Sequence, residues 1–200
     1  GHWGKMKIGV FDRKFNNIFS YYYNSVTGIT LEYNAGSARY RGFNLSFEKS
    51  LPWHINTYFN YAYTNAVYTS TFSGPTGKFV DGDPRVNVPR YTANVGVDYE
   101  NGPAYASLSM HSVGSKYLGI STGRPSNKKL PAYQVFDAQG AYTWNFGHSR
   151  VHALKVALFL DNLLNKRYVS YGYIEKYGNY QLSQMGAPRT IGLDLTAYFN

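Results

Sequence analysis

The chain has 200 residues, a formal net charge of +9 and an aromatic content of 18% that includes 21 tyrosines. Cysteine is absent, which excludes a disulfide scaffold and a cysteine-ligated zinc site, and no apolar run approaches the ~18 residues of a membrane helix. The basic residues are scattered near turns and loops without a stripe of stacking aromatics, so we expect no nucleic-acid partner and expect positive charge beside anionic lipid headgroups instead.

The predicted secondary structure is entirely β, because apolar and polar residues alternate with the period of two that a strand imposes. In "GFNLSFEK" (42–49), for example, Phe43, Leu45 and Phe47 fall on one face and polar residues fall between them. In chain order, the predicted strands cover about 5–19, 30–49, 53–68, 88–100, 103–117, 132–146, 151–163 and 188–199. The facing of the first of these strands is ambiguous.

The charged residues in the middle of these strands fall on one face. That face holds Glu48, Asp98, Asp137, Lys155, Asp161 and Asp194, and the opposite face has no charged residue in its middle. A soluble β-sandwich also alternates, but the connections favour a membrane barrel. Short connections at 49–52, 100–103 and 146–150 alternate with long ones at about 69–87, 118–130 and 164–187. This alternation is expected where every strand crosses one layer whose two sides differ, as in outer-membrane barrels.

Aromatic residues gather at the strand ends that lie beside the short connections. On the apolar face these residues are Phe47, Trp53, Tyr99, Trp144 and Phe199. Amphipathic rings favour the headgroup level of a membrane, so we predict that these residues form the periplasmic girdle. Tyr61, Tyr63 and Tyr91, at the opposite strand ends, are candidates for the outer girdle. A sandwich core would also hold aromatics, but it would not concentrate them at strand ends.

Several stretches, in this order, resemble consecutive segments of the TonB-dependent outer-membrane receptors. They are "NAGSARYRGFNLSFE" (34–48), "YAYTNAVY" (61–68), "VPRYTANVGVDY" (88–99), "LPAYQVFDAQGAY" (130–142), "DNLLNKRY" (161–168) and "GAPRTIGLDLTAYF" (186–199). The sequence departs from the family pattern at Asn44, where Glu is usual, at Asn65, where Asp is usual, and at Asn200, which follows the terminal aromatic residue. The resemblance covers nearly the whole chain.

The resemblance implies an all-β fold, an antiparallel transmembrane β-barrel in which this chain supplies about eight C-terminal strands of a larger, 22-strand barrel. On this basis residues 1–200 are the C-terminal part of the receptor barrel, without the signal peptide, TonB box and plug domain of complete family members. The implied location is the bacterial cell outer membrane. The implied function is TonB-energised uptake of a scarce ligand, in this family mostly a ferric siderophore or a similar iron complex.

The resemblance also implies partners, namely outer-membrane lipid, the barrel-assembly machinery, an iron chelate as ligand, and TonB through the missing N-terminal parts. In family members the assembly machinery reads the terminal strand, which here offers Gly192, Leu195, Ala197 and Phe199. An alternative is a self-contained eight-stranded outer-membrane barrel that acts as an anchor or adhesin, with an interior filled by side chains. Small groups on the polar face suit a wall that faces a plug or water better; they are Ser46, Ser107, Ser109 and Gly192.

Nothing in the sequence predicts an enzyme. The histidines form no helical H-E-x-x-H pair, and "SGPTGKF" (73–79) lacks the spacing of a phosphate-binding loop. "DGDPRVN" (81–87) begins like a calcium loop but places Arg85 where an oxygen ligand is needed. We therefore assign no catalytic residue, no metal site and no cofactor.

The candidate ligand site is the last long connection, 164–187, which we predict to be a loop without secondary structure of its own. Loops of this length tend to be functional. Its aromatic and basic residues are Lys166, Arg167, Tyr168, Tyr171, Tyr173, Lys176, Tyr177 and Tyr180. Tyrosine offers a stacking surface and a hydroxyl, and Lys or Arg pairs with anionic ligands such as ferric chelates. The alternative is that these residues merely decorate the rim of the barrel.

Overall fold

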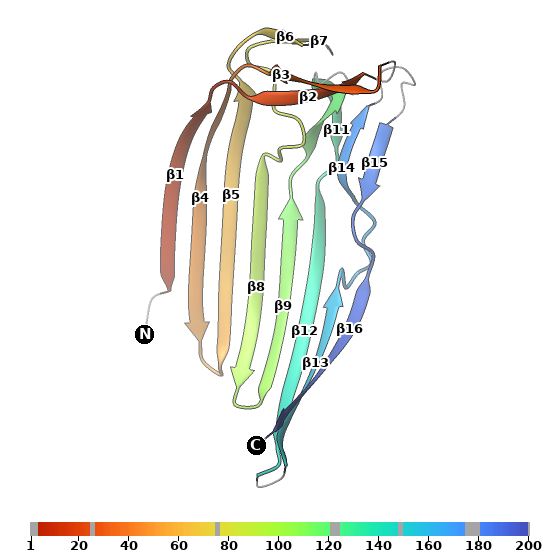
Figure 1. Ribbon diagram of the computed structural model, residues 1–200. Helices are drawn as coiled ribbons and strands as arrows, with labels where there is room; N and C mark the ends of the chain where they lie inside the picture. Colours follow the sequence, from red (N-terminus) through yellow and green to blue (C-terminus); the bar gives the residue numbers. More distant parts are fainter. Residues whose placement is uncertain are drawn as a thin grey trace.

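The computed structural model describes residues 4–24, 27–74, 77–120, 125–147, 150–174 and 181–199. Within these ranges the chain forms sixteen strands and no helix that is long and apolar enough to cross a membrane. Eight strands form one large sheet, and the other eight are shorter and gather at one end of it (Figure 1). We call this the loop end, and the opposite end, where short turns join the strands, the turn end.

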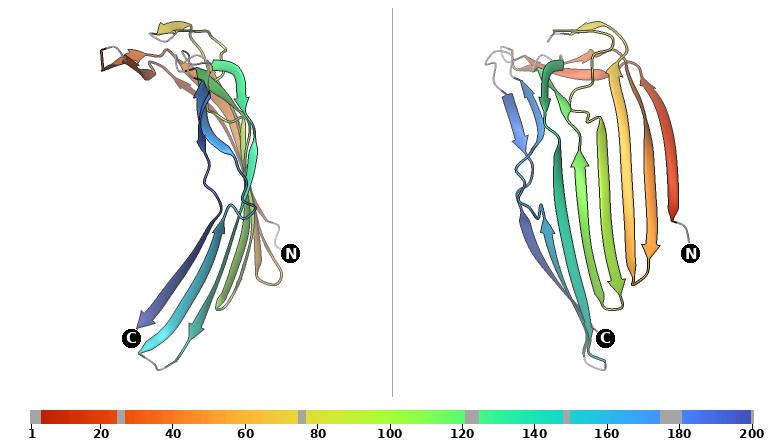
Figure 2. Two further views of the ribbon diagram at one scale, coloured as in Figure 1. Left: turned by 90° about the vertical axis from the view of Figure 1, so that its right-hand side faces the viewer. Right: turned by 180° about the vertical axis from the view of Figure 1, so that it is seen from behind.

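The main sheet is an antiparallel meander, because strands that follow one another around it are also neighbours in space. Its strands in spatial order are β1 (Lys5–Phe15), β4 (Ala38–Leu51), β5 (Ile55–Tyr68), β8 (Tyr91–Asn101), β9 (Ala104–Val113), β12 (Tyr133–Asn145), β13 (Val151–Asp161) and β16 (Thr190–Phe199). The sheet curves like a slice of a barrel wall (Figure 2). The predicted all-β, antiparallel fold is confirmed. β1 and β16 form the two edges and do not pair with each other, so the eight strands do not close into a small barrel.

Cross-strand register carries one apolar face across the whole sheet. Val10 of β1 lies opposite Phe43 of β4, and Phe43 lies opposite Tyr63 of β5, which settles the facing of the first strand. At the other edge, Ile191 and Leu195 of β16 are each 65% exposed. Exposed apolar residues of this face run from β1 to β16, with Val10 83% and Leu193 61% exposed. So large an exposed apolar surface is explained by lipid as its solvent, whereas the opposite, polar face lines the barrel interior.

Two glycines of the polar face make room for an aromatic ring from the neighbouring strand. The ring of Tyr58 lies over Gly96, and the ring of Phe159 lies over Gly192. A Cβ atom at either glycine would collide with the ring. An aromatic side chain placed over a strand glycine restores the packing that the missing side chain cannot supply. Gly192 therefore does not leave open space in the wall, because Phe159 fills it.

The three short connections lie together at the turn end, as the sequence predicts (Figure 1). β5 begins at Ile55 rather than at 53, because Trp53 and His54 both adopt a left-handed φ of 62° in the β4–β5 turn. Trp53 is thus an exposed turn residue and not a strand residue. The other residues predicted for the periplasmic girdle are strand residues exposed on the apolar face, namely Phe47, Tyr99, Trp144 and Phe199. Their role as a girdle stays a prediction.

The long connections contain strands, so the prediction of an unstructured 164–187 loop is wrong. The additional strands are β2 (Phe19–Asn24), β3 (Ile29–Asn34), β6 (Phe72–Gly74), β7 (Gly77–Phe79), β10 (Lys116–Ile120), β11 (Pro125–Leu130), β14 (Val169–Ile174) and β15 (Gln181–Met185). β2–β3 and β6–β7 are hairpins, and β11-β10-β14-β15 form a second sheet. Backbone groups beyond the main sheet find their partners in these pairs. The predicted strands 5–19 and 30–49 are each divided, because Asn17 and Gly36 adopt positive φ values of 53° and 73°.

The buried apolar clusters of the described residues lie at the loop end, where the ends of main-sheet strands meet the shorter strands. One cluster joins Ala38, Tyr68 and Phe79 of β4, β5 and β7. The other joins Leu118 and Leu130, which are almost fully buried, to Ile174 of β14. The reason is that apolar side chains of the main sheet can face lipid, whereas those of the connections are surrounded by water and must be buried against one another.

Candidate ligand-binding site at the loop end

Hydrogen bonds made by the motif "DNLLNKRY" (161–168) hold the chain together just after the end of β13, and we call this hydrogen-bonded motif the staple. Asn162 is only 2% exposed and has a left-handed φ of 50°. Its Nδ2 donates to the carbonyl oxygens of Lys166 at 2.9 Å and Ala187 at 3.0 Å, and its Oδ1 accepts from the Lys166 amide at 2.7 Å. Its own amide donates to Oδ1 of Asp137 on β12 at 2.8 Å. Asparagine suits the position because it both donates and accepts and tolerates this φ.

The staple holds the first predicted ligand residues at the base of the connection. Tyr168 stacks on Tyr133 with ring centroids 4.2 Å apart, and it also covers Gly186, where a Cβ would collide with the ring. Lys166 lines a hollow of about 370 Å³ with Tyr91 and Tyr133, and Tyr168 lines a separate one of about 400 Å³ that also includes Tyr133. The structure therefore does not bring Lys166 and Tyr168 to one site. Tyr168 packs as part of the wall, and Lys166 lies on its outward side.

Tyr171 and Tyr173 are presented by a strand of the second sheet. They alternate along β14 with Gly172 and Ile174, which face the Leu118 cluster, so both tyrosines lie on the opposite face of that sheet. Tyr171 is exposed and Tyr173 is partly exposed. Arg167 is exposed beside the staple. Lys176, Tyr177 and Tyr180 lie outside the described residues.

Two residues that sequence reasoning missed join the long connections to one another. Nζ of Lys116 donates to the carbonyl oxygen of Ser170 at 2.7 Å, and burial lowers the pKa of this lysine. Asn87, with a φ of 57°, donates from Nδ2 to the carbonyl oxygen of Gly172 at 3.1 Å and from its amide to that of Tyr117 at 2.9 Å. Three connections are therefore held in one fixed arrangement. No local pattern in the sequence predicts these long-range hydrogen bonds.

The polar face carries a cavity of about 440 Å³ near the loop end, and sequence reasoning also missed its charge. The cavity is lined by Phe11, Arg13, Phe15, Ile18, Tyr40, Thr64 and Arg85, with no carboxylate among them. Nε of Arg85 donates to the Tyr40 hydroxyl at 3.2 Å, and the guanidinium lies over the Tyr68 ring, 4.6 Å from its centroid. The backbone of Arg85 is fixed by its amide, which donates to the Ala66 carbonyl oxygen at 2.9 Å.

This arrangement suits binding rather than covalent chemistry. Two arginines and several rings face one cavity, which is complementary to an anion that carries flat or apolar groups. The described residues contain no group of three or more His, Cys, Asp or Glu that could hold a metal ion directly. Arg85 makes "DGDPRVN" unsuitable as a calcium loop, because it stands where an oxygen ligand is needed. In the structure, the same residue contributes a positive charge to the cavity. Arg85 stands out in the sequence, but the residues that contact it, Tyr40 and Tyr68, lie on β4 and β5.

The curved sheet, its bare apolar face, the short turns at one end and the hairpins at the other define a section of a transmembrane β-barrel. Residues 1–163 match the sequence model of the family described as TonB dependent receptor-like, beta-barrel. The chain belongs to this family of outer-membrane receptors. The family consists of receptors and transporters and not of enzymes, as the sequence predicts, and the location is the bacterial outer membrane.

Known relatives agree in sequence and in fold. The ferrichrome outer membrane transporter/phage receptor of Escherichia coli (strain K12) is 30% identical over 138 residues, which cover 68% of this chain and 17% of the relative. The ferric yersiniabactin uptake receptor FyuA from Yersinia pestis superposes with a TM-score of 0.71 at 18% identity, over 97% of this chain and 27% of that one. The copper transporter OprC gives 0.70 at 19% identity, over 99% and 29%. The chain thus spans less than a third of each of these proteins.

Proposed function

We propose that residues 1–200 are the C-terminal part of the barrel of a TonB-dependent receptor, and that this receptor takes up a ferric siderophore or a similar anionic iron complex. The observation that carries the proposal is the cavity between Arg13, Arg85 and Tyr40 on the polar face. Ferric chelates with carboxylate, catecholate or hydroxamate arms offer oxygen atoms for guanidinium groups and flat surfaces for rings. Relatives named for ferrichrome and for ferric yersiniabactin support an iron complex as cargo.

The proposed partners follow from the same assignment. TonB would act through N-terminal parts of the receptor, and the polar face of the sheet would contact a plug domain. The barrel-assembly machinery would read β16, which is a free edge of the sheet. On this strand Leu195, Ala197 and Phe199 lie on the apolar face and Gly192 lies on the polar face beneath Phe159.

Uptake by the intact receptor tests the proposal. The receptor is produced in a strain that lacks its own receptors for ferrichrome, ferric citrate and ferric yersiniabactin, and uptake of each chelate loaded with radioactive iron is measured with and without functional TonB. We expect TonB-dependent uptake of at least one chelate. Arg85→Ala should lower uptake at limiting chelate about tenfold or more, since a hydrogen bond to a charged group contributes roughly 1.5–3 kcal/mol.

The controls separate loss of the site from loss of charge or fold. Lys49→Ala removes one positive charge at the turn end, on the apolar face, and should leave uptake unchanged. Arg85→Lys keeps the charge without the planar fork and should give an intermediate rate. Uptake of no chelate, or equal losses for Arg85→Ala and Lys49→Ala, would contradict the proposal.

A further inference from the structure

Charged residues are rare on the apolar face of the main sheet, and most of them share one place. Cross-strand register and strand alternation put the following charged residues of the eight strands on this face: Asp12, Lys14, Arg39, Arg41 and Lys49. Lys49 lies beside the β4–β5 turn at the turn end. The other four gather on β1 and β4 at the loop end. We call these four residues the outward basic cluster.

Register fixes the position of the cluster along the two strands. Asp12 lies opposite Arg41, and Lys14 lies opposite Arg39, in the two rows of the apolar face that follow the pair Val10 and Phe43. A strand rises about 3.3 Å per residue, so these rows lie roughly 7 and 13 Å beyond Val10 along the strand. The cluster therefore begins one row beyond the apolar pair Val10 and Phe43, on the side of the loop end.

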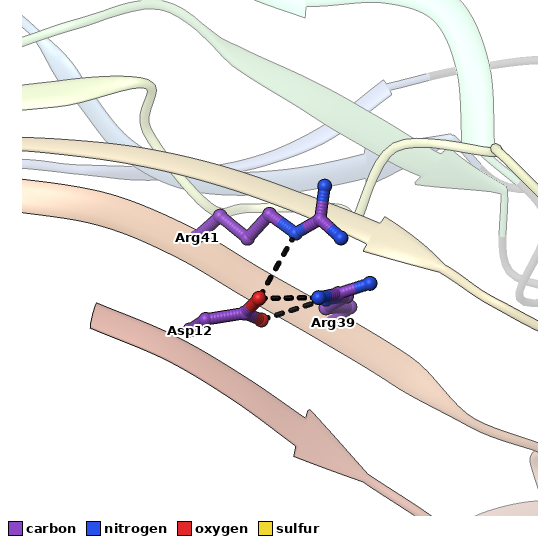
Figure 3. A network of polar contacts seen from close by, with 3 residues as sticks. All are labelled: Asp12, Arg39 and Arg41. Carbon is purple, nitrogen blue, oxygen red and sulfur yellow. Dashed lines mark hydrogen bonds and ion pairs between the residues drawn. The ribbon is translucent and has the colours of Figure 1, made fainter.

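The acid of the cluster holds two arginines side by side (Figure 3). Nε of Arg39 donates to Oδ1 of Asp12 at 2.6 Å, and Nη2 of Arg39 donates to Oδ2. Nε of Arg41 lies 3.3 Å from the same Oδ2. Every side chain in this network is between one-third and six-tenths exposed. Asp12 thus orients the guanidinium groups without burying them.

The cluster keeps a surplus of positive charge and of donors. Lys14, Arg39 and Arg41 carry three positive charges against the single negative charge of Asp12. Each guanidinium has five N–H donors, and among the described residues both Nη groups of Arg41 have no protein acceptor. Guanidinium groups bind phosphate through paired donors, and a basic cluster beside a bilayer attracts anionic headgroups.

We propose that Lys14, Arg39 and Arg41 form a binding site for the phosphate of an anionic lipid headgroup in the outer leaflet, with Asp12 as a positioning residue. The occupant is a membrane lipid because the site lies on the outward face and continues directly into the apolar rows of Val10 and Phe43. A lipid can place acyl chains against those rows while its phosphate meets the arginines. The site is separate from the cavity at Arg85, which lies on the other face of the same strands.

Lipid binding by the intact receptor in neutral detergent tests the proposal. The probes are a bisphosphorylated glucosamine glycolipid, the same glycolipid without phosphates, and inorganic phosphate, and bound lipid is counted by native mass spectrometry. We expect the phosphorylated lipid to bind and the dephosphorylated lipid to bind at least about tenfold more weakly. The double variant Arg39→Gln/Arg41→Gln should lose the same factor, whereas Lys49→Gln should bind like the parent receptor.

Two further arms keep the test decisive. Lys14→Gln leaves the Asp12 ion pairs intact, so it reports on the site even if the double variant fails to fold, and it should weaken binding about threefold. Inorganic phosphate at the concentration of the lipid should not compete with it. Equal binding of the dephosphorylated lipid, full competition by inorganic phosphate, unchanged binding in Lys14→Gln, or an equal loss in Lys49→Gln would overturn the proposal.

Discussion

The main sheet and the loop end are both built from β-strands, yet they are stabilised in opposite ways. In the sheet, Leu158 and Leu193 face each other across β13 and β16, and both are exposed because their solvent is lipid. At the loop end, Leu118 and Leu130 are almost fully buried against neighbouring connections. An apolar residue of the sheet needs only the correct face, whereas one of the loop end needs a particular partner. The two regions should therefore respond differently to substitution.

The largest expected effect is on the lipid side of the sheet. Leu158→Arg places a charge in the apolar face at mid-strand, and it should lower the free energy of unfolding by about 2–4 kcal/mol. Ala157→Ser, one residue away on the polar face, should cost less than about 1 kcal/mol, because Ala157 is buried opposite Asp194 and the new hydroxyl has a polar neighbour there. Denaturant unfolding of the intact receptor in lipid vesicles measures both. Equal losses would mean that the two faces are wrongly assigned.

The staple after β13 should be the most sensitive polar position. Asn162→Ala removes three side-chain hydrogen bonds from a buried position with a positive φ, so the free energy of unfolding should fall by about 2–3 kcal/mol. Asn165→Ala is the matched control. It has a similar φ of 51°, but its side chain accepts a single bond, 3.3 Å from the Arg189 amide. If Asn165→Ala lowered the free energy of unfolding as much as Asn162→Ala, the hydrogen bonds of Asn162 would not explain the loss.

Ring-over-glycine packing predicts a smaller effect on the polar face. Gly192→Ala should lower the free energy of unfolding by about 1–2 kcal/mol, because the new methyl group meets the Phe159 ring. Gly140→Ala on the inner strand β12 would bring the new methyl group no closer than 4.0 Å to another atom and should be nearly neutral. Combining Gly192→Ala with Phe159→Leu should recover part of the loss. If the two alanine variants unfold at the same denaturant concentration, the ring does not set the requirement for glycine.

The smallest effect concerns the two tyrosines of β14 together with Tyr177. Replacing Tyr171, Tyr173 and Tyr177 together with alanine should lower ligand uptake by the intact receptor about threefold, less than Arg85→Ala, because the β14 tyrosines are presented on the second sheet and do not line the arginine cavity. The initial rate of chelate uptake measures it. Unchanged uptake in the triple variant would mean that these residues only decorate the rim.

The main sheet could be predicted from sequence because one local rule governs it. A period of two assigns Leu154 and Lys155 to opposite faces without any knowledge of their neighbours. The site could not be predicted in the same way. Arg13 of β1 and Arg85 of the connection between β7 and β8 line one cavity only because the chain folds these segments together. The parallel pair between Gly119 and Tyr173 likewise joins connections that are far apart in the chain. Such contacts depend on tertiary packing, and no local pattern encodes them.

The strand breaks show the same limit on a smaller scale. Asn17 and Gly36 end β1 and β3 through their backbone conformation, yet asparagine and glycine also occur within strands, as Asn44 and Gly42 do in β4. Trp53 has an aromatic side chain typical of the membrane interface, but its φ places it in a turn. Residue type alone therefore marks the region of a boundary without fixing the residue at which it falls.

The orientation of β13 in the membrane tests the central claim most directly. The chain has no native cysteine, so single cysteines at positions 154 to 160 of the intact receptor can carry spin labels, provided the rest of the receptor is also free of cysteine. Accessibility to oxygen, which concentrates in lipid, and to a water-soluble nickel complex is then measured in vesicles. We expect oxygen accessibility to peak at Leu154, Val156, Leu158 and Leu160 and to fall at the residues between them. A flat profile, or peaks at Lys155, Ala157 and Phe159, would contradict the assignment of the apolar face to lipid.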